Sequence, residues 1–151
     1  MRIVDHVFEA LDRLAPPRVA RAHCDVPCGI YDPHAAQIAS QTVQAMVTKM
    51  QALTPPASGG DLAARQTYEN TATRMITTKE QHAEIVKREV LILWTDYFKP
   101  PHLERWPDLH TKVWLTCKKA SQCKQEVNAQ AAQELVDQVN EIANIFWESK
   151  K

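Results

Sequence analysis

The side chains most suited to chemistry lie in one short stretch, residues 23–31, which read His-Cys-Asp-Val-Pro-Cys-Gly-Ile-Tyr. Thiolates select late transition metals, and imidazole suits zinc, copper, iron and nickel. Pro27 fixes one backbone angle and Gly29 permits a sharp reversal, so Cys28 can fold back toward Cys24. The stretch therefore reads as a compact chelate in which the sulfurs of Cys24 and Cys28 can both face one metal ion.

The spacing of the two cysteines is a weak signal by itself. Cys-x3-Cys is neither the Cys-x2-Cys of a zinc ribbon nor part of a paired four-cysteine site. From the spacing alone, two structural cysteines in a loop are as good an interpretation as a metal site.

The residue types are more specific than the spacing. Residues 23–33, which add Asp-Pro to the stretch above, closely resemble the nickel hook of the nickel-containing superoxide dismutases. Residues 93–102, Leu-Trp-Thr-Asp-Tyr-Phe-Lys-Pro-Pro-His, resemble the second signature of that family. Residues 145–150, Ile-Phe-Trp-Glu-Ser-Lys, resemble its C-terminal end. The resemblance thus covers residues 23–151, and we call residues 23–31 the hook.

The resemblance implies disproportionation of superoxide to dioxygen and hydrogen peroxide, with one nickel ion per subunit alternating between Ni(III) and Ni(II). It implies equatorial ligation by the sulfurs of Cys24 and Cys28, the freed amine of His23 and the amide nitrogen of Cys24. The imidazole of His23 would bind axially in the oxidised state. Anionic thiolate and amidate donors suit the higher charge, and a planar set of N and S donors suits nickel better than zinc.

Further residues receive roles from the same resemblance. Tyr31 would stand over the metal, admitting superoxide and excluding larger molecules, although a packing tyrosine beside a loop is an equal interpretation. Asp25 would hold the hook through hydrogen bonds, although a turn-forming Asp is nearly as good an explanation. Tyr97 and Lys99 match family positions near the hook.

The chain departs from the family at one point. Many members hold the axial imidazole with a glutamate on the first helix of the bundle and an arginine on the second. The matching residues here are Ala39 and His82. Either His82 takes over as a hydrogen-bond partner of the axial imidazole, or it is a solvated histidine on a charged helix face.

Residues 1–22 read as a removable leader. Six apolar residues at helical spacing predict a helix that Pro16 and Pro17 end, and acidic residues and Arg13 interrupt any secretory apolar core. The resemblance implies that a processing peptidase cuts between Ala22 and His23, which frees the amine of His23. The alternative is an ordinary N-terminal helix that stays attached to the domain formed by residues 23–151.

Length and charge narrow the class of protein. The 151 residues suit one domain, and 18 basic against 18 acidic residues argue against nucleic acid or an anionic membrane as the main partner. Three glycines are too few for a phosphate-binding loop, and no apolar run is long enough for a membrane span. Reduced thiols and a non-secretory leader favour a cytoplasmic protein.

Apolar residues at spacings of three and four predict four helices over residues 32–53, 61–98, 107–121 and 125–150, with a break near residues 70–71 and a loop over residues 102–106. The helix starts use Asp32 with Pro33, and Asp61. The fold class is therefore all-α, an antiparallel four-helix bundle that carries an N-terminal metal-binding hook. The resemblance adds a homohexamer in which each hook packs against neighbouring subunits.

The remaining candidates for chemistry are weaker. Cys117 and Cys123 are six apart, which predicts a buried thiol and a helix-end thiol, and the four tryptophans are expected in the core. Two functions compete with a dismutase: a non-catalytic nickel-binding carrier, and a thiol-redox protein that cycles a disulfide between Cys24 and Cys28.

Overall fold

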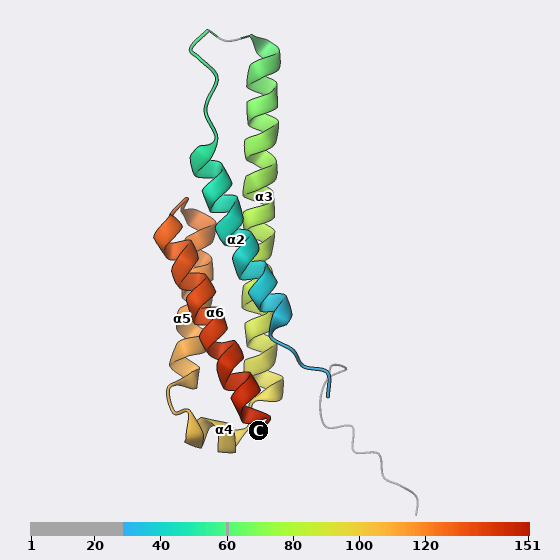
Figure 1. Ribbon diagram of the computed structural model, residues 1–151, viewed down its shortest axis with the longest axis vertical. Coiled ribbons are helices and arrows are strands. Elements are labelled where there is room, and N and C mark those ends of the chain that lie inside the picture. Colours follow the sequence, from blue (N-terminus) through green and yellow to red (C-terminus); the bar gives the residue numbers. More distant parts are fainter. Residues whose placement is uncertain (1–28, 60) are drawn as a thin grey trace, which may run out of the picture.

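The computed structural model describes residues 29–59 and 61–151, and this part of the chain is helical with no strand. Its four long helices are α2 (His34–Ala52), α3 (Leu62–Ile92), α5 (Leu109–Gln125) and α6 (Ala129–Ser149). A π-helical turn, η1 (Leu93–Tyr97), and a short helix, α4 (Pro100–Arg105), join α3 to α5. The predicted all-α bundle is confirmed: α2 and α5 each lie beside both α3 and α6 (Figure 1).

Side-chain pairs show that neighbouring helices are antiparallel. Along each interface, residue numbers rise on one helix as they fall on the other. Between α2 and α6 the pairs are Gln37–Asn140 and Gln44–Gln133. Between α5 and α6 they are Lys112–Glu141 and Lys119–Glu134. Between α3 and α5 the same order appears in Lys87–Ser121 and Glu84–Lys124.

α6 contributes more buried residues to the core than any other helix, and its apolar stripe faces the three other long helices. Leu135, Val139, Ile142 and Phe146 recur at threes and fours and are each at most 1% exposed. Removing this much apolar surface from water is the main favourable term in folding such a bundle. The seam predicted for the last helix is therefore confirmed.

Asp61 caps α3 as predicted, whereas Pro33 and not Asp32 holds the cap position of α2, and the start of α6 also differs from the prediction. The carboxylate of Asp61 accepts from the backbone N–H of Ala64 at 2.6 Å, and that of Asp32 accepts from His34 at 2.7 Å. The start of α6 was predicted near residue 125, but α5 continues to that point. Asn128 caps α6 instead, because its side-chain oxygen accepts from the N–H of Ala131 at 3.0 Å.

Three other expectations were wrong. The break near residues 70–71 is absent, because Asn and Thr cost a helix only a few tenths of a kcal/mol each. The loop over residues 102–106 mostly belongs to α4, because a proline in the first turn starts a helix as readily as it stops the preceding one. Trp114 and Trp147 lie on the surface, 61% and 44% exposed, whereas Trp94 and Trp106 are half-buried against the core as expected.

The start of α3 extends beyond the α5–α6 connection (Figure 1). Its buried residues begin only at Lys79, whose side chain is inserted under the end of α5. The ammonium of Lys79 donates to the carbonyls of Cys123, Lys124 (2.7 Å) and Glu126 (3.2 Å). Carbonyls at a helix C-terminus have no partner within the helix, so this lysine serves as their cap. Burial lowers the pKa of Lys79, and the nearby carboxylate of Glu80 opposes that shift.

We expect Lys79→Met to lower the free energy of unfolding by about 1–3 kcal/mol, because Met fills similar volume but leaves buried carbonyls without a donor. Urea denaturation measures the change. The matched control is Lys118→Met, since Lys118 is exposed on α5, and it should change stability by less than about 0.5 kcal/mol. Equal effects from the two variants would show that the cap contributes nothing.

Candidate active site

Of the residues predicted as metal ligands or catalytic residues, Tyr31 is the one that lies within the described part of the chain. The predicted metal ligands His23, Cys24 and Cys28, and the predicted catalytic residue Asp25, lie outside the described residues. Their roles therefore stay predictions. The structure describes the end of the hook, at Tyr31, and the residues of the bundle that contact it.

Tyr31 is buried at the end of the bundle, just before α2. Its side chain is 9% exposed, and its ring lies 5.8 Å from that of Tyr97 at an angle of 59°. Its carbonyl accepts a long hydrogen bond of 3.4 Å from the ammonium of Lys150. This burial agrees with the packing interpretation of Tyr31, and it also holds the last residue of the hook against the bundle.

Tyr97 joins the three segments on which the family resemblance was based. It is the last residue of η1, whose π-type hydrogen bond runs from the N–H of Phe98 to the carbonyl of Leu93 at 3.0 Å. Its hydroxyl lies 2.7 Å from the hydroxyl of Ser149, and its ring lies 4.4 Å from that of Phe146. Because π turns are rare and occur frequently at functional sites, this turn marks the end of the bundle as the functional one.

His102 and Lys99 complete the surroundings of Tyr97. The His102 ring stacks on Tyr97 at 5.7 Å, and its Nδ1 accepts from the backbone N–H of Lys99 at 2.9 Å. The ammonium of Lys99 is exposed and donates to the carbonyl of Asp96 at 2.8 Å. A positive charge thus lies at the exposed end of η1.

Within residues 29–59 and 61–151 there is no group of three or more His, Cys, Asp or Glu side chains arranged to hold a metal ion. Cys117 is half-buried and Cys123 is buried near the end of α5, and both are free thiols. Burial raises the pKa of both thiols, so neither is prepared to act as a thiolate. The described residues therefore offer no alternative to the hook as the metal site.

The two positions at which the resemblance predicts a departure, Ala39 and His82, lie within the described residues. Ala39 is 1% exposed and lies in the core, where its methyl group can accept no hydrogen bond. His82 is half-buried on α3, and its Nδ1 lies 2.8 Å from the carbonyl of Thr78. A carbonyl only accepts, so Nδ1 carries a proton, and Nε2 is the ring nitrogen left for another partner.

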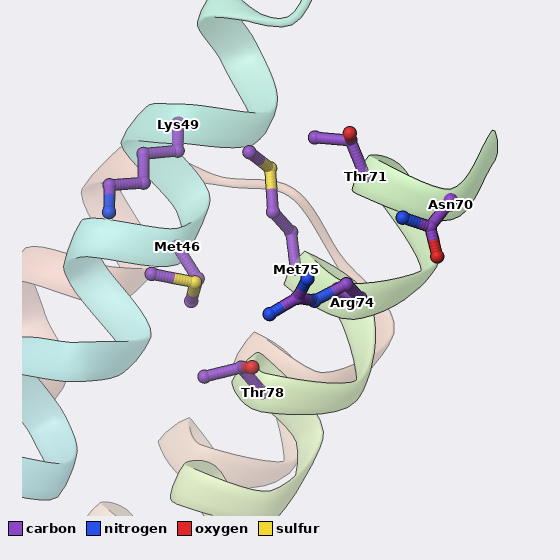
Figure 2. Close-up of a pocket in the computed structure, with 7 residues that line it drawn as sticks. All are labelled: Met46, Lys49, Asn70, Thr71, Arg74, Met75 and Thr78. Carbon is purple, nitrogen blue, oxygen red and sulfur yellow. The ribbon is translucent and has the colours of Figure 1, made fainter. Parts of the chain in front are cut away.

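A pocket of about 270 Å³ lies between α2 and α3 at the other end of the bundle (Figure 2). It is lined by Met46, Lys49, Asn70, Thr71, Arg74, Met75 and Thr78. On α2, Met46 is twelve residues beyond the start of the helix, a distance of about 18 Å. This pocket is therefore separate from Tyr31 and its neighbours.

Comparison with known proteins gives a consistent match over most of the chain. A family model described as nickel-containing superoxide dismutase matches residues 18–150. The chain belongs to this family. It is 42% identical over 142 residues to superoxide dismutase [Ni] of Streptomyces coelicolor, which covers 93% of this chain and 98% of the relative. It is 41% identical to the protein of the same name from Streptomyces seoulensis, with the same coverage.

A solved native structure of a nickel superoxide dismutase has the same fold. It superimposes with a TM-score of 0.70 at 40% identity and covers 85% of this chain and all of its own. The helical arrangement that carries Tyr31 and Tyr97 is therefore that of the nickel superoxide dismutases.

Sequence reasoning missed the contacts made by Ser149 and Lys150, although it singled out the segment that contains them. Ser149 is bonded to Tyr97, and the ammonium of Lys150 lies over the ring of Phe146 at 4.3 Å. The Ser149–Tyr97 and Lys150–Tyr31 hydrogen bonds have no local signal, because their partners are 52 and 119 residues apart. Only the C-terminal resemblance pointed to them.

Proposed function

We propose that this protein disproportionates superoxide at a nickel ion held by His23, Cys24 and Cys28. The reaction, the enzyme class and the metal follow from membership of the family, since the matched model and the relatives of about 42% identity are nickel superoxide dismutases. The assignment of individual ligands is our proposal. It is supported by the convergence of all three family-like segments at one end of the bundle, through Tyr31, Tyr97 and Ser149.

The donor set of the hook fits nickel. Two thiolates, an imidazole and backbone nitrogens are N and S donors of the kind that nickel accepts, and anionic sulfur donors stabilise its higher oxidation state. When bound, nickel supplies a one-electron couple between Ni(II) and Ni(III). The thiols of Cys24 and Cys28 must lose their protons to bind, and metal binding itself drives that loss.

The remaining residues of the site would control access and position. Two superoxide ions and two protons give one dioxygen and one hydrogen peroxide, so small anions must reach the hook. The exposed ammonium of Lys99 provides a positive charge that attracts them. Tyr31 would limit the size of molecules that reach the metal, and Asp25 would hold the hook in shape.

Processing of the leader is part of the proposal. A peptide bond between Ala22 and His23 would tie up the amine of His23, so we propose that a peptidase removes residues 1–22. The solved native structure supports a mature chain of this length. It covers 85% of this chain, or about 128 residues, which is close to the length of residues 23–151. The curated relatives cover 93% of the chain and so reach into the leader.

Assembly and location are proposed on the family resemblance. We infer a homohexamer in which each hook packs against neighbouring subunits, and a cytoplasmic protein. In the described residues, no helix combines the length and apolar character that crossing a membrane requires.

We expect Cys28→Ser in the processed protein to lose nickel and to lower superoxide consumption by about 100-fold or more, because changes to groups that merely support ligands already cost 10–100-fold. Metal analysis and direct measurement of superoxide decay check both effects. The matched control is Cys117→Ser, a free, half-buried thiol outside the hook, which should retain both.

Measurements on the wild-type protein separate the competing functions. Nickel binding without superoxide consumption by the wild-type protein would favour a carrier. Activity that survives nickel chelation but is lost on thiol alkylation would favour a thiol-redox protein. Either result would contradict the proposed dismutase.

His82 is proposed to take over from the missing carboxylate and arginine by accepting a hydrogen bond from the axial imidazole through Nε2. This role is supported by the contact of Nδ1 with Thr78, which sets the tautomer. We expect His82→Ala to change the axial-ligand signature in electron paramagnetic resonance and to lower turnover. The nearby exposed Gln81→Ala is the control. An unchanged signature and rate in His82→Ala would refute the role.

A further inference from the structure

Lys150, at the end of α6, has its ammonium among aromatic rings. Its Nζ lies 4.3 Å from the ring centroid of Phe146, 5.2 Å from that of Trp147 and 6.0 Å from that of Tyr97. A cation within about 6 Å of an aromatic ring is attracted to it. The side chain of Lys150 is therefore held in place at three rings, although it comes from the penultimate residue of the chain.

The same ammonium donates to the main-chain carbonyl of Tyr31 at 3.4 Å. The ring of Tyr31 is held separately by Tyr97, at 5.8 Å. Tyr97 in turn shares a 2.7 Å hydrogen bond with Ser149, the residue before Lys150. Tyr31 is thus held at two points, through its ring by Tyr97 and through its carbonyl by Lys150. Tyr97 and Lys150 are themselves linked through Ser149, so both the ring and the backbone of Tyr31 are fixed to the bundle.

Tyr31 is three residues after Cys28, with only Gly29 and Ile30 between them. Three residues span at most about 10–11 Å when fully extended. Fixing the backbone of Tyr31 therefore bounds where Cys28 can lie relative to η1 and α6. A change at Lys150 would be transmitted to the hook through this short connection.

We propose that Lys150 is a positioning residue for the nickel hook, acting through the carbonyl of Tyr31. The proposal rests on the proposed ligand role of Cys28. Lys150 does not touch the reacting atoms in this account. It restrains the main chain at the point where the hook joins the bundle, and the rings of Phe146, Trp147 and Tyr97 restrain Lys150.

The test compares processed, nickel-loaded wild-type protein with Lys150→Met, Lys150→Arg and the matched control Lys151→Met. Lys151 is the neighbouring exposed lysine, and within the described residues its side chain makes no ion pair, hydrogen bond or ring contact. All four samples are compared by electron paramagnetic resonance of the oxidised centre, by kcat/KM for superoxide over a range of ionic strength, and by Tm.

We expect Lys150→Met to shift the resonance spectrum and to lower kcat/KM about threefold to tenfold at every ionic strength. Lys150→Arg should restore the wild-type spectrum, because guanidinium also binds aromatic faces and donates to carbonyls. Lys151→Met should keep the wild-type spectrum, and any loss of rate in it should disappear at high salt, as expected for loss of a steering charge.

A wild-type spectrum and rate constant in Lys150→Met would overturn the proposal, as would equal spectral changes in Lys150→Met and Lys151→Met. If Lys150→Met does not fold, Lys150→Gln replaces it with the same expected and opposing results, because it too removes the cation from the rings. Failure of the wild-type, nickel-loaded protein to consume superoxide would instead contradict the proposed function, so the two failures are distinguishable.

Discussion

The constraint on which the site depends is the attachment of Tyr31 to the end of the helical bundle. The hook precedes the first helix of the bundle, so its position is set by whatever holds the chain where the two meet. In this structure the ring of Tyr31 contacts Tyr97, and its carbonyl is reached by Lys150. Three segments that are far apart in the sequence thus meet at one point. Phe146, which is fully buried, and the π turn of η1 both lie at that meeting point.

The chemistry and the scaffold are divided between different parts of the chain. The described bundle has buried thiols whose pKa values burial raises, and it has no cluster of metal-ligating side chains. The chain belongs to the nickel superoxide dismutase family, and we propose that the hook carries the thiols that bind the nickel ion. The bundle contributes a fixed attachment and a nearby positive charge. On the family resemblance, Ala39 and His82 take the positions of a glutamate and an arginine, and we propose that His82 supports the axial imidazole instead.

Much of the fold could be predicted from periodicity and from local chemistry. The seam of α6 and the cap at Asp61 are local patterns, and both are confirmed. Two errors, the break near residues 70–71 and the loop over residues 102–106, concern local helix propensity. Other features depend on non-local effects. Nothing near Trp114 or Trp147 in the sequence indicates that packing leaves them outside, and nothing near Lys79 indicates that it caps another helix 44 residues away. For the site, residue types identified the hook and its two companion segments, but the contacts of Lys150 and Ser149 depend on the tertiary fold.

The central claim is that the mature chain begins at His23 and binds nickel through that residue and the two cysteines of the hook. Native mass spectrometry of the purified, active protein tests it most directly, because the chain mass gives the N-terminus and the mass of the intact assembly gives the metal. The account predicts a chain of residues 23–151 carrying one nickel ion per subunit. A chain that begins elsewhere and still dismutates superoxide at full rate, or equal activity with zinc in place of nickel, would contradict it.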